Sequence, residues 1–378
     1  MEISLKKIIF VQDISNAKLM EFKKLIDRGA ELERMNEALH REDTQFIIIY
    51  GRRRIGKSEL IKRIVKARHK AIYFLSDTSS ETVQRVAFSK VAASVIDGFD
   101  KVIYPDWETL FRSFNNQLSE RMLVCLDEFP YLVKSCDVLP SIIQKLLNEK
   151  ILKFDLVLCG SSQQLMHGYV LNRQSPLYGL ANEIMKMQPI PAQYMSMAME
   201  CDAVQAVEEY AIWGGVPRYW ELRRDYPDKE TAIRKVLLDP QGPLIEEPQR
   251  LLRDDMRDTV QASTLLTIIG NGANKLSEIA NRAGKDSSTI SEPLSKLREL
   301  GYVSREVPFG ESPKKSKKGI YHINDSLLRF HYQFIVPYRS ILELGRMDIV
   351  MQVVLSQLPL FIGQCWELLC REYVSGNI

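Results

Sequence analysis

Short, almost uninterrupted apolar runs alternate with amphipathic segments along the first half of the chain. The runs are rich in β-branched residues and predict buried strands at 46–50, 71–75, 122–126 and 154–159. Apolar positions recur with helical spacing at 26–39, 59–68, 81–96, 107–118, 141–147 and from 162 onward. Buried strands that alternate with helices are typical of a parallel sheet covered on both faces. The sequence therefore predicts an α/β fold that extends to about residue 190.

The pattern changes in the second half of the chain. Residues 191–255 are mostly helical in pattern, and the next segment carries three short helical patterns, at 259–269, 276–283 and 288–300. Two predicted strands, at 301–307 and 319–323, flank a loop with four lysines. Three helices and a basic hairpin are typical of a winged helix-turn-helix. Pro293 removes a donor from the third helix, so we expect that helix to begin near Ser291.

A phosphate-binding motif stands between the first predicted strand and the next helix. The motif G-x-x-x-x-G-K-[ST] is matched in full by Gly51-Arg52-Arg53-Arg54-Ile55-Gly56-Lys57-Ser58. Its backbone amides and the start of the following helix, up to Glu59, would hold the phosphates of ATP. We expect Lys57 on the β- and γ-phosphates and the Ser58 hydroxyl on Mg²⁺. The three arginines would contact phosphate or an acidic surface, or two of them would form a solvated charge run.

Two carboxylates follow the buried strand at 122–126. Asp127 and Glu128 are costly in this place unless they serve a cation. We assign Asp127 to the magnesium shell and Glu128 to activation of the attacking water. The alternative is a pair of acids that start a helix. After the next strand, Ser161 is the preferred sensor of the γ-phosphate, although Ser161 or Ser162 could instead cap the following helix.

These residues together resemble the archaeal-type ATPase family, a branch of the AAA+ and STAND-like P-loop ATPases. The resemblance runs from about residue 25 to the end of the chain. Its signatures are Ile26-Asp27-Arg28 with Glu31, the arginine-rich Gly51–Ser58, Leu126-Asp127-Glu128-Phe129-Pro130, Gly160-Ser161-Ser162, Ser175-Pro176-Leu177-Tyr178-Gly179 and Gly214-Gly215-Val216-Pro217.

The resemblance implies a domain order and further contacts. It implies an N-terminal extension at 1–24, a P-loop ATPase core at 25–190, a helical lid at 191–255, a winged helix-turn-helix at 256–335 and the helical start of a nuclease-like domain at 336–378. It also implies that Pro217 lies close to the base or sugar of the nucleotide and that Arg28 contacts adenine. From the residues alone, the segment before Pro217 is only a turn before a helix.

The chain departs from the family pattern in two places. Relatives usually carry an arginine where this chain has Leu180, which would make turnover slow if that arginine assists hydrolysis. The acidic residues and lysine of a PD-(D/E)xK nuclease centre would lie beyond Ile378, so we expect no nuclease site from these residues.

Composition narrows the class of protein only a little. The chain has 378 residues, 45% hydrophobic and 26% charged, with a net charge of +3, which by itself indicates no polyanionic partner. Six scattered cysteines indicate buried free thiols rather than disulfides or a metal site. No signal peptide and no run of about 18 apolar residues is apparent, so we expect a cytoplasmic protein with no membrane contact.

Three functional readings follow. The first is a Mg²⁺-dependent ATPase that acts as a nucleotide-dependent switch. The second is a DNA-binding regulator with little turnover, in which Ser288, Thr289 and Ser291 contact DNA. The lysines of the loop, Lys314, Lys315, Lys317 and Lys318, would neutralise backbone phosphates. The third is a scaffold that works through a protein partner or a homo-oligomer, with the winged helix as a protein-contact module.

Overall fold

The computed structural model describes residues 26–312, 316 and 318–374. The expected N-terminal extension and three of the loop lysines, Lys314, Lys315 and Lys317, lie outside the described residues. The chain divides into two compact units, Met1–Gln188 and Pro189–Ile378, which are described separately.

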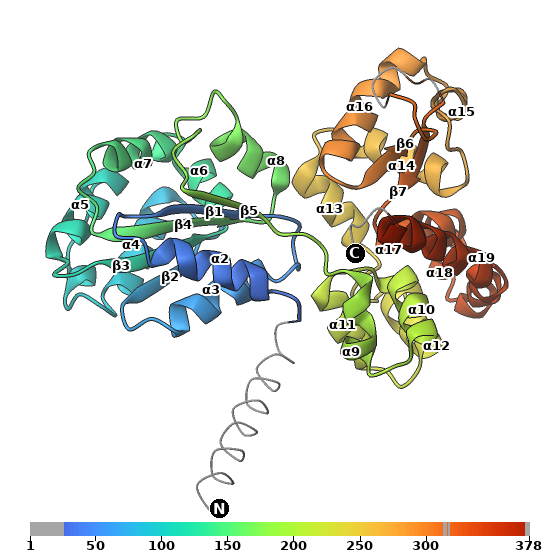
Figure 1. Ribbon diagram of the computed structural model, residues 1–378, viewed down its shortest axis with the longest axis horizontal. Helices are drawn as coiled ribbons and strands as arrows, with labels where there is room; N and C mark the ends of the chain where they lie inside the picture. The colour runs from blue at the N-terminus through green and yellow to red at the C-terminus, as the bar shows by residue number, and fades with distance from the viewer. Residues whose placement is uncertain (1–25, 313–315, 317, 375–378) are drawn as a thin grey trace, which may run out of the picture. The chain divides into compact units, whose positions relative to one another are not determined.

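A five-stranded parallel sheet forms the centre of the first unit (Figure 1). Its strands are β1 (Phe46–Tyr50), β2 (Ala71–Leu75), β3 (Met122–Asp127), β4 (Phe154–Gly160) and β5 (Glu183–Lys186). Their order across the sheet is β2-β3-β4-β1-β5, with every neighbouring pair parallel. The carboxyl ends of β1, β4 and β3 therefore lie next to one another at one edge, which brings the polar residues that follow each strand together.

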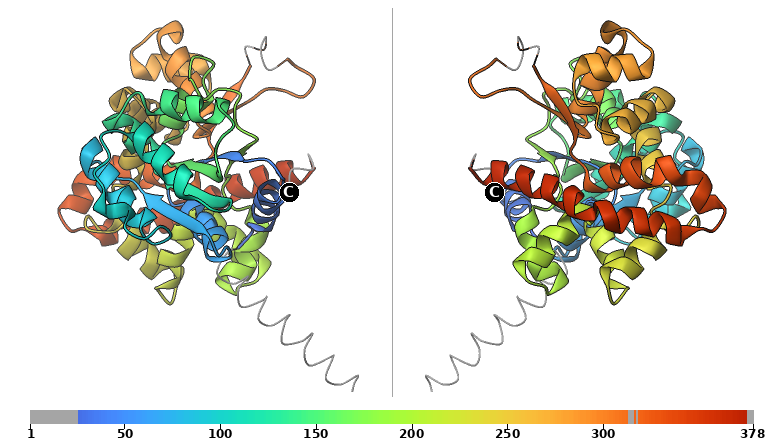
Figure 2. Two further views of the ribbon diagram at one scale, coloured as in Figure 1. Left: turned by 90° about the vertical axis from the view of Figure 1, so that its left-hand side faces the viewer. Right: turned by 90° about the vertical axis from the view of Figure 1, so that its right-hand side faces the viewer.

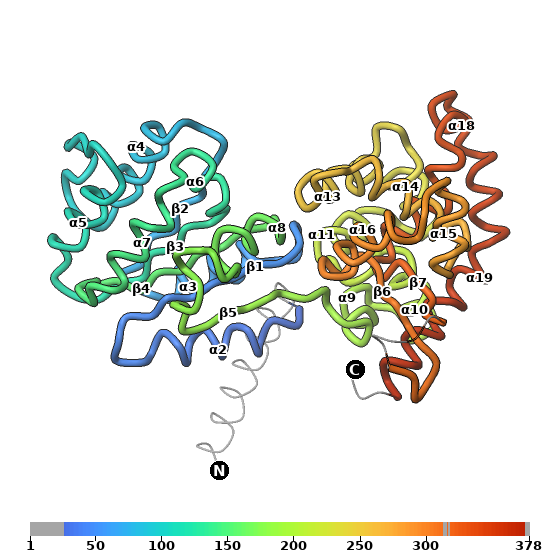
Figure 3. Tube along the Cα trace, turned by 90° about the horizontal axis from the view of Figure 1, so that it is seen from above, coloured from blue at the N-terminus to red at the C-terminus, as the bar shows by residue number. Residues whose placement is uncertain are grey.

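Helices cover both faces of this sheet (Figure 3). They are α2 (Gly29–Leu39), α3 (Lys57–Lys66), α4 (Glu81–Ala92), η1 (Phe99–Lys101), α5 (Trp107–Gln117), α6 (Phe129–Ser135), α7 (Leu139–Asn148), α8 (Gln163–Met166) and η2 (His167–Leu171). Alternate strand residues face opposite sides. Ile47 and Ile49 pack with α2 and α3, whereas Phe46 and Ile48 belong to the larger core under α4 to α7. The predicted α/β fold is confirmed.

The larger core of the first unit is aromatic. The Phe88 ring meets the rings of Phe74, Trp107, Phe111 and Phe114 edge-on, with centroids 5.5 to 6.0 Å apart. Edge-to-face pairs of this kind add specific geometry to the burial of large apolar side chains. β2 and β3 pack on this core, and residues at their carboxyl ends belong to the site described below.

The sequence patterns located four of the five strands of the sheet and missed the fifth. β5 is short, and its outermost residues, Glu183 and Lys186, are charged. It therefore lacks the near-continuous apolar run of a central strand. Glu183 accepts hydrogen bonds from Arg34 and Arg41, both at 2.8 Å, which hold this edge strand against the α2 region.

The second unit is mostly helical. Its elements are η3 (Ala192–Tyr194), α9 (Met195–Met199), α10 (Ala203–Trp213), α11 (Pro217–Arg224), α12 (Lys229–Ala232), η4 (Ile233–Leu238), α13 (Glu247–Asp255), α14 (Thr259–Gly270), α15 (Leu276–Ala283), α16 (Ser287–Glu299), β6 (Val303–Glu306), β7 (Ile320–Ile323), α17 (Ser326–Phe330), η5 (His331–Ile335), η6 (Val336–Tyr338), α18 (Arg339–Glu343) and α19 (Met347–Val374). α10 packs on both α17 and α19, the long red helix of Figure 2.

Three helices and a hairpin form a separate core within this unit. β6 and β7 pair antiparallel, and side chains of α14, α15 and α16 pack under them. The predicted helices and strands of this segment are confirmed. The expected start of the third helix near Ser291 is wrong, because α16 begins at Ser287 and continues through Pro293. Buried Ile290 and Leu294 on either side of the proline hold the helix together despite the missing donor.

α19 has the length and mean hydropathy of a membrane span, although its sequence contains no unbroken run of about 18 apolar residues. By length and composition alone, its 28 residues could cross a membrane. In its most apolar 18-residue stretch, 33% is buried inside the protein. No unbroken apolar run marks α19 in the sequence, because residues such as Gln357, Pro359 and Gly363 are interspersed among the apolar ones. Val354, Leu358 and other residues of one face are buried. A cytoplasmic location stays a prediction.

Candidate functional site: a phosphate-binding loop with two carboxylates

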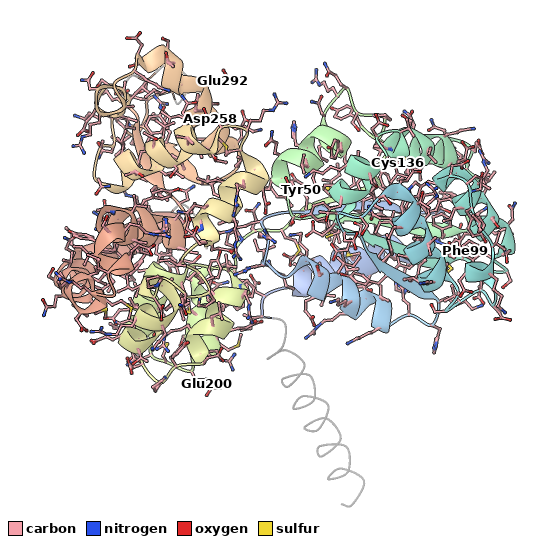
Figure 4. The ribbon with its side chains drawn as sticks, turned by 180° about the vertical axis from the view of Figure 1, so that it is seen from behind. Tyr50, Phe99, Cys136, Glu200, Asp258 and Glu292 are labelled. Carbon is pink, nitrogen blue, oxygen red and sulfur yellow. The ribbon has the colours of Figure 1, made fainter. Side chains whose placement is uncertain are left out.

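The phosphate-binding loop leaves β1 directly after Tyr50, which is labelled in Figure 4, and enters α3 at Lys57. Gly51 has φ +148°, and a Cβ there would lie 2.7 Å from the Met187 carbonyl oxygen. Gly56 has φ +98° at the N-cap of α3. Both positions thus require glycine, one for close approach and one for a left-handed backbone. The loop ends at a helix N-terminus, where free amides favour an anion.

Lys57 is buried at the base of this loop. Its ammonium group donates to the carbonyl oxygens of Gly51 and Arg52, both at 2.9 Å. A lysine held by the loop that it belongs to is already ordered, which lowers the entropic cost of placing it on a phosphate. Glu59 is exposed on α3, with its carboxylate 3.8 Å from Arg63. The exposed Glu59 side chain is therefore not a candidate for phosphate binding. Its backbone amide, in the first turn of α3, is.

The arginines around the loop are less exposed than a solvated charge run would be. Arg52 is buried, and Arg53 and Arg54 are half-buried. Arg28 is also buried. Its guanidinium donates to Glu31 at 2.9 Å, to the Ile55 carbonyl at 3.1 Å and to the Gln188 carbonyl at 2.8 Å. Arg28 thereby ties the phosphate-binding loop to the last residue of the first unit, and its expected contact with adenine stays a prediction.

Asp127, at the end of β3, is fully buried and accepts three hydrogen bonds. Ser58 Oγ and Tyr73 Oη each donate to Oδ2 at 2.6 Å, and the Glu128 amide donates to Oδ1 at 2.9 Å. Charge-assisted bonds of this kind stabilise a buried carboxylate. The structure therefore brings Ser58 of the loop and Asp127 into direct contact, although 69 residues separate them.

Glu128 has a left-handed backbone, with φ +54°, which is uncommon for a residue other than glycine. The hydroxyl of Ser76 lies 2.7 Å from the carbonyl oxygens of both Asp127 and Glu128, and the Ser76 amide donates to the Asp127 carbonyl at 3.0 Å. These bonds hold the turn. Ser161 Oγ donates to Glu128 Oε2 at 2.9 Å. Left-handed residues held in this way cluster at functional sites.

The two serines after β4 have different partners. Ser162 caps α8, since its hydroxyl accepts a hydrogen bond from the Leu165 amide at 3.2 Å. Ser161 instead holds the Glu128 carboxylate. Of the alternatives that the sequence left open, the capping role belongs to Ser162. Whether Ser161 also senses the γ-phosphate stays a prediction.

Tyr73 and Ser76 were missed by the motif analysis. Both belong to β2 or its exit, and β2 reaches the site only because it pairs with β3. No local pattern marks them, and knowledge of the strand order would have been needed to find them. Burial and the hydrogen bond to Asp127 raise the pKa of Tyr73 far above its usual value. Its hydroxyl therefore remains a donor to Asp127 across the working pH range.

The donors present suit Mg²⁺ held jointly with a nucleotide. The Ser58 hydroxyl donates a hydrogen bond to Asp127, which leaves the lone pairs of Ser58 Oγ free for a cation. Carboxylate and hydroxyl oxygens are hard donors that suit Mg²⁺. Among the described residues, no group of three or more His, Cys, Asp or Glu side chains could hold a metal by itself.

Comparison with known proteins decides the family. Residues 25–221 match an ATPase domain predominantly from Archaea. An uncharacterized protein of Methanocaldococcus jannaschii is 31% identical over 356 residues, which cover 92% of this chain and 77% of that protein. The chain belongs to this archaeal ATPase family. With the phosphate-binding motif at Gly51–Ser58, it is a P-loop ATPase by family, as its sequence predicts.

The fold also resembles a solved structure. The ORC2 protein of Aeropyrum pernix, determined in ADPNP and ADP complexes, aligns with a TM-score of 0.54 and 12% sequence identity. The alignment covers 88% of this chain and 96% of the ORC2 chain. At this identity the likeness concerns the fold alone.

Two further positions, Leu180 and Pro217, were named from the sequence. Leu180 is half-buried and packs against the larger core of the first unit, where a charged side chain would be desolvated. Pro217 begins α11 in the second unit, and its contact with the nucleotide stays a prediction.

Proposed function

We propose that this archaeal-family ATPase hydrolyses ATP with the help of Mg²⁺. One observation carries the proposal: the loop serine, Asp127, Glu128 and Ser161 form a continuous chain of hydrogen bonds between the phosphate-binding loop and the ends of β3 and β4. A plain phosphate-binding loop needs no such carboxylates. A hydrolase needs one to support the cation and one to orient water.

Each residue of the site would then have a separate role in binding or hydrolysis. Lys57 would move its ammonium from the loop carbonyls to the β- and γ-phosphates. Ser58 and Asp127 would hold Mg²⁺, which supplies charge neutralisation on the phosphates. Glu128 would accept a proton from the attacking water, with Ser161 fixing its carboxylate. Arg52, Arg53 and Arg54 would add positive charge around the same anion.

Glu128→Gln tests this assignment. We expect the variant to bind ATP within about twofold of the wild type and to lose roughly 100-fold or more in phosphate release, because general-base removal typically costs that much. Glu120→Gln is the control, since Glu120 is an exposed carboxylate of the same unit that pairs with Lys70. Unchanged phosphate release in Glu128→Gln would sink the base assignment, and lost ATP binding would make Glu128 a structural residue.

We propose further that nucleotide binding works as a switch through Arg28. This buried arginine bridges the Ile55 and Gln188 carbonyls, so a loop that rearranges around phosphates also pulls on the last residue of the first unit. A ligand shifts a two-state element only through contacts that differ between the states, and the Ile55 bond would be such a contact. Residues 191–255 would then act as the lid and 256–335 as a winged helix-turn-helix.

Hydrogen exchange tests the switch. ATP should slow amide exchange at Met187, whose amide donates to the Tyr50 carbonyl at 2.8 Å, in the wild type but not in Arg28→Met. If Arg28 instead contacts adenine, Arg28→Met would lose its preference for ATP over GTP while the exchange response survives. An exchange response that is identical in both proteins would contradict the switch.

DNA binding is the second candidate function. Ser288, Thr289 and Ser291 are exposed on α16, the third helix of the α14–β7 segment, and Lys318 is exposed in the loop just before β7. Exposed polar side chains on the third helix are placed as in a helix that enters a major groove. Binding of a short duplex at two salt concentrations, with and without ATP, separates the readings. Binding that is independent of salt, or absent, would favour the protein-contact alternative.

A further inference from the structure

The side chain that reaches the Asp127 carboxylate from the neighbouring strand is Tyr73. In the β2–β3 pairing, Tyr73 lies opposite Cys125, which is two residues before Asp127. The Tyr73 hydroxyl donates to Asp127 Oδ2 at 2.6 Å, as short as the bond from Ser58 to the same oxygen. The phosphate-binding motif and the acidic motif include no residue from β2.

The acceptor sites of Asp127 show what this bond does. Each carboxylate oxygen has two good acceptor sites. On Oδ2 both are taken, by Ser58 and Tyr73, and on Oδ1 one is taken by the Glu128 amide. The Cys159 thiol of β4 is a further side-chain partner of this carboxylate. The orientation of the carboxylate is thereby determined by groups from four elements, α3, β2, β4 and the β3 exit.

Loss of the Tyr73 hydroxyl would free one site on Oδ2 in a carboxylate that is fully buried. A buried acceptor without a donor is costly, and the group would turn to recover one. A turned carboxylate would present a different oxygen to the cation and would no longer hold the Ser58 hydroxyl in place. Neither change touches the loop amides or Lys57, which bind phosphate without the metal.

We propose that Tyr73 is a positioning residue for the magnesium site, acting through Asp127. The inference rests on the proposed Mg²⁺-dependent function. It predicts that Tyr73 contributes to the part of the ATP affinity that depends on Mg²⁺. The affinity for ATP without Mg²⁺ should not depend on Tyr73. A tyrosine that only stabilises the fold would weaken both parts equally or neither.

Tyr73→Phe tests the proposal through binding alone. ATP affinity is measured by calorimetry at saturating Mg²⁺ and in EDTA, and the ratio of the two is the magnesium increment. We expect Tyr73→Phe to keep its EDTA affinity within about twofold and to lose roughly tenfold of the increment, as the loss of one hydrogen bond to a charged group predicts. The Mg²⁺ concentration for half-saturation should rise by about the same factor.

Two further variants make the test sharper. Tyr73→Leu removes the ring as well, and it should show the same loss of increment if the hydroxyl carries the effect. Tyr104→Phe is the matched control, because its hydroxyl donates to the Phe99 carbonyl at 3.3 Å within the same unit, away from the loop. It should keep the wild-type increment.

The outcomes separate this inference from the function on which it rests. If the wild type shows a magnesium increment and Tyr73→Phe shows the same increment, the role of Tyr73 is overturned, but the proposed magnesium site is not. Parallel losses in Mg²⁺ and in EDTA would make Tyr73 a residue of the fold only. A wild-type protein with no increment would overturn the magnesium site itself, and the role of Tyr73 with it.

Discussion

The strand ends of the first unit and the α14–β7 segment of the second carry their polar residues in opposite ways. At the strand ends, Asp127 is fully buried, and it accepts hydrogen bonds from Ser58, Tyr73 and the Glu128 amide. In the second segment, Ser288 and Thr289 are exposed, and Lys318 pairs with Glu311 on the surface. The first arrangement holds its polar groups in fixed positions, whereas the second offers charge and polarity without a rigid shape.

This difference has an energetic consequence. Buried charge-assisted bonds are strong, and losing one partner leaves the other desolvated. Exposed ion pairs contribute little and are screened by salt. Single substitutions should therefore produce large, ligand-specific effects at the strand ends and small, salt-dependent effects in the α14–β7 segment. Substitutions at Lys57 and Lys318 test that contrast directly. Substitutions at Gly215 and His331 measure what packing and burial contribute elsewhere in the second unit.

The largest effect is expected from Lys57→Ala. The ammonium would make several charge-assisted contacts to phosphate, so we expect ATP affinity to fall about a thousandfold. A fluorescent nucleotide titration measures it. Lys66→Ala, at the exposed end of the same helix, serves as the control and should bind normally. Retention of affinity in Lys57→Ala would remove the basis for treating the strand ends as a nucleotide site.

The second effect concerns backbone geometry in the second unit. A Cβ on Gly215 would lie 2.1 Å from the Ile190 carbonyl oxygen, so Gly215→Ala should lower the free energy of unfolding by about 3 kcal/mol. Gly363→Ala, in α19 where nothing lies within 4 Å, should be neutral or slightly stabilising. Chemical denaturation compares them. Equal stability of the two variants would show that the turn at Gly215 can yield.

The third effect is a pH dependence that belongs to the second unit. Burial, with the nearby charge of Arg339, lowers the pKa of His331 from 6.5 to about 3. The folded state therefore keeps His331 neutral, while the unfolded state takes up a proton below pH 6.5. Its contribution to stability is complete above pH 6.5 and is lost as the pH falls toward 3. Between pH 6.5 and about 5 the free energy of unfolding should drop by roughly 2 kcal/mol.

His331→Phe should flatten this acid-side slope, whatever its effect on stability at neutral pH. His69→Gln, at an exposed position, should leave the slope unchanged. Unfolding by urea at several pH values measures both. An unaltered slope in His331→Phe would place the acid sensitivity in other groups.

The smallest effect is expected from Lys318→Ala. Lys318 and Glu311 form an exposed pair, so stability should change by less than about 0.5 kcal/mol. If the segment binds DNA, affinity should fall two- to threefold at low salt, and the slope of affinity against salt should decrease by about one. Lys90→Ala, on α4, is the control. A large loss of affinity that salt does not change would indicate a shaped site instead of a charged surface.

Local sequence carried the strongest predictions about this molecule. The loop at Gly51–Ser58 was identified because glycines, a lysine and a serine at fixed spacing dictate a backbone that cradles phosphate. Asp127 and Glu128 were identified because acids directly after a buried strand need a reason to be there. Helix and strand types followed from apolar periodicity. Errors came where packing overrode a local rule, as at Pro293, where buried neighbours on both sides continue the helix.

Other features had no local signal. The edge strand β5 is too short and too charged to stand out, and Tyr73 and Ser76 are ordinary residues of a strand and its exit until β2 is placed beside β3. The separate partners of Ser161 and Ser162 also depend on where β4 ends relative to Glu128.

The sequence by itself determined the family, the phosphate-binding loop and the pair of carboxylates, because spacing along the chain is enough to specify a turn and the charges that follow a strand. Only the tertiary structure decided which side chains orient those carboxylates. Strand order places Tyr73, Ser58 and Ser161 within hydrogen-bond distance of Asp127 and Glu128, although the chain separates them by 33 to 69 residues. Contacts over such separations arise from the packing of the whole sheet, and no short motif encodes them.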